Sequence, residues 1–231
     1  MVYIPDHFRP SEDEVLSLLR DHGAVDLITV TARGLLATLL PMIWDEPGSR
    51  PGLGAHGALL GHVAIKNEQW REPAIGEALV IVRGPDAYIT PSWYAAKREH
   101  GRVVPTWNYV TIHAYGRLVV HHDAHWLEAN VRRLTASREA SREAPWGVDD
   151  APAEYIAGQL RAIVGVELLI DRLEAKSKLS QNRSAADIDG VIAGLDAEGR
   201  PDLAAAMRAS AGADRRGPLI RRGSAGEPPG P

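Results

Sequence analysis

Short extended runs alternate with turn residues through the first 120 residues of this chain, and this alternation limits the possible fold more than any other feature. We interpret Gly84-Pro85 and Gly116 as breaks between neighbouring strands. Roughly six or seven short strands with such turn signals predict a β-barrel or a β-sandwich. The predicted strands are 24–30, 35–43, 58–63, 78–82, 87–90, 108–113 and 117–120.

Helical signals flank and follow this β-rich part. Ser11 and Glu14 have the spacing of a capping box, which predicts a helix that ends near Gly23. Asp123 is a suitable N-cap for a helix of about 124–137. The remaining predicted elements are helices at 153–163, 185–195 and 201–208 and a strand at 166–170. The expected fold class is therefore α+β.

The composition excludes several classes of protein. The chain has 231 residues, no cysteine and a formal net charge of −4, so disulfides, thiolate metal sites and a cysteine nucleophile are excluded. The charge gives no overall attraction to nucleic acid. No run of apolar residues is long enough for a membrane span, and no signal peptide is recognisable at the N-terminus, so we expect a cytoplasmic protein without a membrane partner.

An aromatic stretch at 84–109 is the first candidate for a binding site. It contains two of the six tryptophans and three of the six tyrosines, interleaved with short polar side chains such as Thr90 and Ser92. Ser92 is a plausible N-cap for a short helix that reaches His100. A ring-lined wall with a few hydrogen-bonding groups suits a planar ligand. Aromatic residues at a buried sheet corner are the alternative interpretation.

Two polar segments are further candidates. The segment 176–183 (KSKLSQNR) contains two amines, a guanidinium and two amides, which suit a phosphate or a carboxylate, although a solvated helix cap has the same composition. His62 precedes a polar turn and is either a ligand-binding imidazole or a hydrogen-bonded structural residue. The run from His121 to His125 has metal-like spacing, but Asp123 is better explained as a helix cap.

Recognition of DNA has little support in the sequence. A helix-turn-helix needs a basic recognition face, whereas the predicted helix at 124–137 mixes arginines with Glu128. DNA is thus a possible but weakly supported partner.

Six sequence blocks, in order, resemble the PaiB-like family of FMN-binding negative transcriptional regulators. They are YIPDHF (3–8), GHVAIKNEQW (61–70), GPDAYITPSWY (84–94), VPTWNY (104–109), RAIVGVEL (161–168) and KLSQNR (178–183). The resemblance implies an FMN-binding split β-barrel that forms a homodimer with two pockets at the subunit interface. The expected domain covers 1–200, with an N-terminal helix and C-terminal helical additions. A basic, Pro/Gly-rich tail at 209–231 is expected to be disordered.

The resemblance also implies a set of cofactor contacts. These are Thr38, His62, Lys66, Asn67, Trp70, Ser92, Trp93, Tyr94, Thr106, Trp107, Asn108, Lys178, Gln181 and Asn182. Two positions depart from the family pattern, because Leu39 stands where a histidine is common and Ser177 where an aromatic residue is common. The function implied is that of a flavin-binding regulator or a flavin-dependent reductase.

A second branch, the heme-dependent piperazate synthases, is similar over the same blocks. Those enzymes form an N–N bond in an N-hydroxylated amino acid. In this alternative the cofactor is heme b, His62 is its axial metal ligand, and Lys66, Lys178 or Gln181 orients the amino acid. No catalytic residue is assigned for either alternative.

Overall fold

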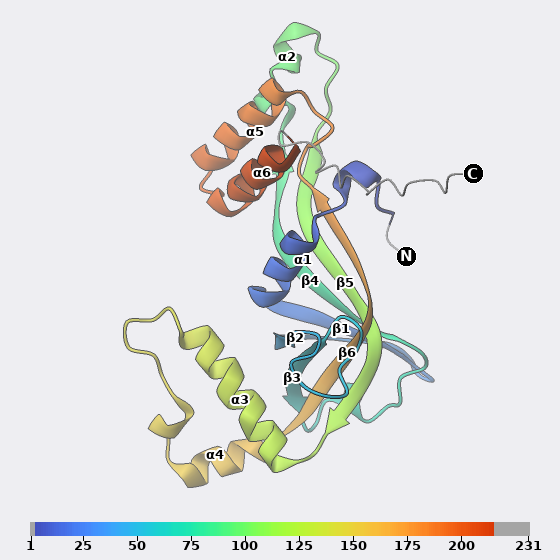
Figure 1. The fold of residues 1–231 in the computed structure, drawn as a ribbon, viewed down its shortest axis with the longest axis vertical. Coiled ribbons are helices and arrows are strands. Elements are labelled where there is room, and N and C mark those ends of the chain that lie inside the picture. Colours follow the sequence, from blue (N-terminus) through green and yellow to red (C-terminus); the bar gives the residue numbers. More distant parts are fainter. Residues whose placement is uncertain (1–2, 215–231) are drawn as a thin grey trace, which may run out of the picture. The chain divides into compact units, whose positions relative to one another are not determined.

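The computed structural model describes residues 3–214, which divide into two compact units (Figure 1). The first, which we call the barrel unit, comprises the described parts of 1–84 and 109–177. The second, the helical unit, comprises 85–108 and the described residues from 178 onward. Because β4, β5 and β6 contribute residues to both units, the chain passes between them along strands.

Six strands form a closed barrel in the order β1-β2-β3-β6-β5-β4. The pairs β1–β2, β1–β4, β2–β3 and β3–β6 are antiparallel, with Val25 opposite Leu40 and Leu59 opposite Leu168. The predicted α+β class with a barrel core is confirmed. The strands are β1 (Ala24–Thr31), β2 (Gly34–Asp45), β3 (Ala58–Ala64), β4 (Ala78–Ile89), β5 (Thr106–His121) and β6 (Ile163–Lys178).

Alternate residues of these strands fill the barrel interior. Leu27, Met42, Leu59, Val80 and Leu168 are fully buried there, which agrees with the period-two alternation of strands that have one buried face. The described helices of the barrel unit are η1 (Asp6–Phe8), α1 (Glu12–Arg20), η2 (Glu68–Trp70), α3 (Ala124–Glu139), η4 (Val148–Asp150) and α4 (Ala153–Leu160).

The predicted caps of α1 and α3 are confirmed. Ser11 accepts a hydrogen bond from the backbone N–H of Glu14, and the Glu14 side chain accepts one from the backbone N–H of Ser11. Asp123 accepts a hydrogen bond from the backbone N–H of Trp126 at 2.8 Å. These local signals were readable because a cap depends only on residues within one helical turn.

Two predicted strand breaks are wrong. β4 runs through Gly84-Pro85 without a turn, and β5 runs through Gly116. Both glycines are sites of close approach instead. A Cβ at Gly84 would lie 2.9 Å from Cβ of Val110, and one at Gly116 would overlap the carbonyl oxygen of Leu169. A glycine inside a strand therefore marks a tight contact here, and not the end of the strand.

Several helix boundaries also differ from the prediction. Thr90, and not Ser92, caps the short helix η3 (Pro91–Trp93), because its hydroxyl accepts a hydrogen bond from the backbone N–H of Ser92. The helix predicted at 153–163 ends at Leu160, and β6 begins at Ile163. The last helix, α6 (Pro201–Asp214), extends six residues into the predicted tail, whose remainder lies outside the described residues.

The helical unit is built on α5 (Ala185–Ala197) and α6, which pack against each other (Figure 1). The short helix η3 contacts α5, and α2 (Ala96–Glu99) contacts η3. Trp93 lies directly against Gly190 and Gly194, where a Cβ would overlap the tryptophan. The buried Asp187 carboxylate accepts a hydrogen bond from the backbone N–H of Ala96 at 2.9 Å. These contacts fix the aromatic stretch to α5.

The outer face of β1 and β2 carries solvent-exposed aliphatic side chains. In the register of β1 and β2, Val30 is opposite Leu35 and Asp26 is opposite Leu39, and the exposed fractions of the three aliphatic residues are 43%, 73% and 67%. Ile75, which is 60% exposed, adjoins them, because its backbone N–H donates to the carbonyl oxygen of Val30. We call Val30, Leu35, Leu39 and Ile75 the exposed sheet face.

None of the helices within 3–214 has the length and apolar character needed to cross a membrane.

Candidate functional site

The segment after His62 forms a short, well-bonded loop at the end of β3. Asn67 caps η2 by accepting a hydrogen bond from the backbone N–H of Gln69 at 2.8 Å, and its Nδ2 donates to Oγ1 of Thr38 at 3.0 Å. Lys66 is solvent-exposed on the same loop. The structure thus brings Thr38 to Asn67, the sequence neighbour of Lys66, although 29 residues separate Thr38 from Asn67.

Trp70 is held at the end of this loop. Its Nε1 donates to the carbonyl oxygen of Ile65 at 3.1 Å, and its ring meets that of His122 edge-on with centroids 5.2 Å apart. The guanidinium of Arg71 lies 5.1 Å from the Trp70 ring centroid. The indole is therefore a fixed, partly exposed wall beside Lys66 and Asn67, as a planar ligand requires.

Gln69 is the residue of this loop that the sequence reasoning missed. Its buried amide donates to the carbonyl oxygens of Leu27 and Leu36 at 3.0 and 3.3 Å and approaches Oγ1 of Thr29 at 3.2 Å. The single amide thereby anchors the loop to β1 and β2. A glutamine between Glu68 and Trp70 carries no sequence signal for such a role, because its acceptors come from strands about 40 residues earlier.

His62 lies on β3 opposite Gly165 of β6, where the ring of Trp126 occupies the space that a Cβ would fill. Its Nδ1 is buried and has no hydrogen-bond partner within the described structure. Burial lowers the pKa of His62 below its usual value of 6.5, so the imidazole is neutral at pH 7. A buried ring nitrogen without a partner is suited to contact a ligand.

Three partly or fully buried histidines give a pH-dependent stability. Burial is the main cause that lowers the pKa of His22, His62 and His113. The unfolded chain then binds more protons than the folded chain below about pH 6.5, so we expect the free energy of unfolding to fall as the pH drops from 7 to 5.5. Each histidine contributes at most about 1.4 kcal/mol per pH unit.

Urea denaturation between pH 5.5 and 7.5 measures this slope. A His62→Gln variant should flatten this slope by about one proton's contribution, because it removes the buried imidazole. Equal slopes for the wild type and His62→Gln would contradict the assignment of His62 as a neutral buried group.

The other predicted contacts lie in the helical unit. Lys178 Nζ donates to Oγ1 of Thr106 and to the carbonyl oxygen of Trp107, the latter at 2.9 Å. Trp107 is half-exposed, and its Nε1 donates to Asp86 at 2.8 Å. Tyr88 meets the Trp107 ring edge-on, with centroids 6.2 Å apart. Lys178, Thr106 and Trp107 are thus neighbours, as predicted.

A strained turn follows Lys178. Ser180 is buried with a left-handed φ of 67°, which is uncommon for a residue other than glycine. Its hydroxyl accepts a hydrogen bond from the fully buried Asn108 amide at 2.9 Å. Gln181 accepts a hydrogen bond from the backbone N–H of Leu179, and Asn182 is exposed. Asn108 therefore has a structural role in holding this turn.

The remaining predicted contacts of the helical unit differ in exposure. Ser92 is exposed and accepts a hydrogen bond from Lys97 at 3.0 Å. Trp93 is partly buried against α5. Tyr94 is buried, and the guanidinium of Arg183 lies 4.7 Å from its ring centroid. The interpretation of the aromatic stretch as packing thus holds for Trp93 and Tyr94, while Trp107 presents an open ring surface.

The histidines of the run at 121–125 contact different residues and do not form one site. His121 Nε2 contacts Oε2 of Glu167 at 2.7 Å, and its ring stacks on Trp126 with centroids 4.0 Å apart. Glu167 is buried and also binds Arg50, which in turn binds Asp45. Within residues 3–214 no group of three His, Asp or Glu side chains converges on a possible metal site.

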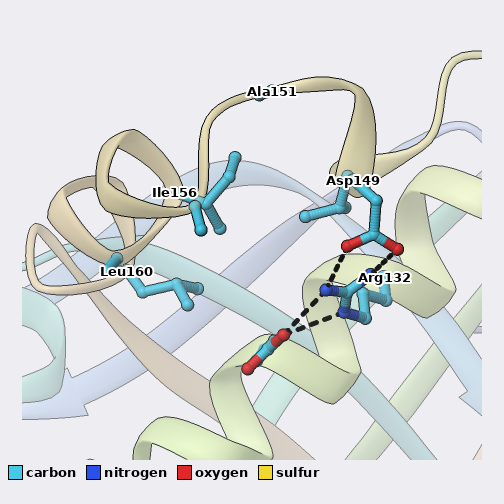
Figure 2. A pocket seen from close by; sticks show the side chains of 9 residues that line it. Arg132, Asp149, Ala151, Ile156 and Leu160 are labelled. Carbon is cyan, nitrogen blue, oxygen red and sulfur yellow. Dashed lines mark hydrogen bonds and ion pairs between the residues drawn. The ribbon is translucent and has the colours of Figure 1, made fainter.

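A further cavity, of about 330 Å³, lies between α3, η4 and α4 (Figure 2). Figure 2 shows Arg132 held by Asp149, with both guanidinium Nη atoms donating to its carboxylate at 2.7 and 2.9 Å. Glu128 accepts another hydrogen bond from Arg132 at 2.9 Å. Arg132 lowers the pKa of the Asp149 carboxyl. Because this guanidinium is bound to two carboxylates, the described residues that line the cavity offer no unpaired positive charge to an anionic ligand.

The fold and the loop at 62–71 together define an α+β split-barrel protein with a candidate surface for a planar ligand. The family described as "Putative FMN-binding domain" matches residues 2–172. An uncharacterized protein of Emericella nidulans is 32% identical over 211 residues, covering 78% of this chain and 84% of that protein. The Bacillus subtilis protein named Protease synthase and sporulation protein PAI 2 is 31% identical over 204 residues, covering 87% and 92%.

The chain therefore belongs to this FMN-binding family, as the PaiB-like sequence blocks predicted. A solved structure of a conserved hypothetical protein from Mycobacterium tuberculosis has the same fold, with a TM-score of 0.51 at 11% identity, covering 79% of this chain and 94% of the other. Of the two departures from the family pattern, Leu39 lies on the exposed sheet face and Ser177 is buried.

Proposed function

We propose that this chain is a homodimeric FMN-binding redox protein whose flavin site includes Thr38 and the loop from His62 to Trp70. The observation that carries the proposal is the hydrogen bond that joins Thr38 of β2 to Asn67, on the same loop as Lys66 and Trp70, in a chain that belongs to an FMN-binding family. FMN, when bound, supplies one- and two-electron transfer.

The side chains present fit the chemical groups of FMN. The exposed Lys66 amine can neutralise the phosphate, and the fixed indole of Trp70 offers an apolar wall for the ring system. The Thr38–Asn67 pair keeps hydrogen-bonding capacity beyond the bond that joins them. The buried Nδ1 of His62 is free to accept or donate one further bond.

The ion pairs formed by arginines of α3 count against DNA recognition and so favour a redox role. Arg132 binds Glu128 and Asp149, and Arg133 binds Asp45. Arg138 donates to the carbonyl oxygen of His22 at 2.6 Å. A recognition helix needs its basic side chains for phosphates and bases, and two of these three arginines, Arg132 and Arg133, are already paired with carboxylates within the fold. Binding to promoter DNA that exceeds binding to random DNA at physiological salt would instead support a regulator.

The visible spectrum of the purified protein, titrated with FMN, tests the flavin assignment. We expect the two-band absorption of a bound oxidised flavin, and about tenfold or more weaker FMN binding for Lys66→Gln. The matched control is Arg117→Gln, which removes one exposed positive charge from β5. A Soret band that disappears in His62→Ala would support the heme alternative, for which a neutral imidazole at His62 is the specific observation.

We assign the homodimer contact to the exposed sheet face. Its aliphatic side chains come from neighbouring strands, and Asp26, the charged residue opposite Leu39, is already paired with Arg83. A contiguous apolar surface of this kind is costly in water and marks an interaction site. The same face on a second copy is complementary in character, since a two-fold contact places apolar side chains against each other.

Light scattering after size-exclusion chromatography measures this contact. The double variant Leu35→Glu, Leu39→Glu should be monomeric at concentrations where the wild type is a dimer, because it would bury four like charges across the two-fold. Tyr155→Glu, at an exposed aromatic residue of α4, is the control and should remain a dimer. A dimer that persists in the double variant would place the contact elsewhere.

A further inference from the structure

A second polar cavity lies in the barrel unit between α1, the end of β2 and the C-terminal half of α3. Its volume is about 360 Å³. None of the residues predicted to contact FMN lines it. The lining residues are Arg20, His22, Met42, Ile43, Trp44, Glu46, Arg133, Ala136, Ser137 and Arg138. The cavity therefore shares no side chain with the proposed flavin loop, and the proposed binding of FMN does not account for its residues.

Positive charge exceeds negative charge around this cavity. Arg20 is paired with Glu46 at 2.8 Å, and Arg133 is paired with Asp45. Arg50 lies behind them, between Asp45 and Glu167. Among the described residues that line the cavity, Arg20, Arg133 and Arg138 carry guanidinium groups and Glu46 carries the one carboxylate, while Asp45 and Asp21 lie close by.

Arg138 is the guanidinium without a carboxylate. In the described structure its one hydrogen bond goes to the neutral carbonyl oxygen of His22, at 2.6 Å, and no carboxylate of residues 3–214 lies within ion-pair distance of it. Burial lowers the pKa of the His22 ring, and the charge of Arg138 lowers it further, so His22 adds no positive charge of its own at neutral pH. Since a guanidinium has five N–H donors, Arg138 keeps most of its donors available at the cavity.

One wall of the cavity is flat and fixed. Trp44 Nε1 donates to the carbonyl oxygen of His56 at 3.1 Å, which holds the indole in place. The guanidinium of Arg20 lies 5.7 Å from the Trp44 ring centroid. The fully buried Met42 and the partly buried Ile43 provide apolar surface beside it. A ligand here meets an aromatic or aliphatic surface at one side and guanidinium donors at the other.

From this arrangement we propose that the cavity binds a small molecule that carries an oxyanion on a flat, apolar body, such as an aromatic phosphate monoester or carboxylate. Arg138 and Arg133 contact the oxyanion, because guanidinium groups bind phosphate and carboxylate oxygens in a forked geometry. The hydroxyl of Ser137 donates a further hydrogen bond, and the ring of the ligand lies against Trp44. This site extends the proposed function by a second ligand.

Calorimetric titration of the FMN-loaded protein with phenyl phosphate tests this site. We expect saturable binding of one phenyl phosphate molecule per chain. Inorganic phosphate should bind more weakly, and phenol, which lacks the anion, should not bind. Benzoate in place of phenyl phosphate distinguishes a carboxylate site from a phosphate site. Absence of saturable binding of both phenyl phosphate and benzoate would mean that the arginines only cap helix ends, and would overturn the proposal.

Variants locate the binding in the cavity. Arg138→Gln should weaken phenyl phosphate binding roughly tenfold or more, and Arg138→Lys, which keeps the charge and the bond to His22, should weaken it less. Arg117→Gln is the control, because it removes the same charge elsewhere on the barrel unit, and it should bind phenyl phosphate as the wild type does. Trp44→Leu should remove the preference for phenyl phosphate over inorganic phosphate.

The flavin spectrum separates this site from the proposed FMN site. Arg138→Gln should retain the flavin content and visible spectrum of the wild type. Loss of flavin in Arg138→Gln, with a normal melting temperature, would show that the cavity belongs to the flavin site and would overturn a second site. Equal binding by Arg138→Gln and Arg117→Gln would also overturn it. Failure of the Lys66→Gln prediction would affect the flavin proposal alone.

Discussion

A Gly116→Ala variant should be strongly destabilised, because the added Cβ would overlap the carbonyl oxygen of Leu169 and lie 2.8 Å from its carbonyl carbon. Both contacts are to backbone of the neighbouring strand β6, so no side-chain rotation can relieve them. Separation of β5 from its neighbour β6 would open the closed barrel. We expect a loss of about 3 kcal/mol or more in the free energy of unfolding, measured by urea denaturation.

Gly23→Ala is the matched control for this substitution. A Cβ at Gly23 meets nothing within 4 Å, so the variant should be as stable as the wild type or slightly more stable. If Gly116→Ala unfolds at the same urea concentration as Gly23→Ala, the close approach of β5 and β6 at Leu169 is not a feature of the folded protein.

The second large effect is expected for Glu167→Ala. The Glu167 side chain is 4% exposed and binds Arg50 through one oxygen and His121 through the other, at 2.7 Å for the histidine. Removal of the carboxylate leaves both partners and Asp45 in an unbalanced, partly buried cluster. We expect the free energy of unfolding to fall by about 2–3 kcal/mol. This is near the low end for breaking a buried ion pair, because Arg50 remains paired with Asp45 and keeps some contact with water.

Glu167→Gln separates charge from shape at this position. The amide retains the volume and part of the hydrogen bonding, so this variant should lose less stability than Glu167→Ala. Differential scanning calorimetry at pH 7 compares the two variants. Equal melting temperatures for Glu167→Ala and the wild type would contradict a structural role for the cluster.

The same cluster predicts sensitivity to acid. Burial acts to raise the pKa of Asp45, but the hydrogen bonds from Arg133 and Arg50 outweigh it and hold the pKa below the usual value of 3.8. The contribution of Asp45 to stability is therefore complete above about pH 4 and is lost as the pH falls below that value. This window is distinct from the histidine window near pH 6.

The fold class was predictable because its signals are local. The alternation of β1 and β2, the capping box at Ser11 and the Asp123 cap each depend on residues within a few positions of one another. The length of β4 and β5 was not predictable from local signals. Glycines such as Gly84 and Gly116 are common in turns and were therefore interpreted as strand breaks. Their close contacts with Val110 and Leu169, which only the folded structure shows, explain why glycine stands inside a continuous strand.

The candidate site was predictable in part. The resemblance to the family selected Asn67 and Thr38, which the structure joins by a hydrogen bond, although 29 residues separate them. Gln69 was missed because its partners are backbone carbonyls, which leave no trace in the sequence. The arginines of the second cavity were missed for a similar reason. Arg20 and Arg138 are ordinary last-turn residues of helices until the fold brings α1 and α3 to the same cavity.

The anchoring of the loop from His62 to Trp70 by Gln69 has a consequence for local motion. Because one buried amide ties the loop to the backbones of Leu27 and Leu36, the loop cannot open without disturbing the hairpin of β1 and β2. The hairpin and the loop should therefore exchange their amide hydrogens as one cooperative unit. A ligand that contacts only Lys66 and Trp70 would then slow hydrogen exchange along β1 and β2, at positions that it does not touch.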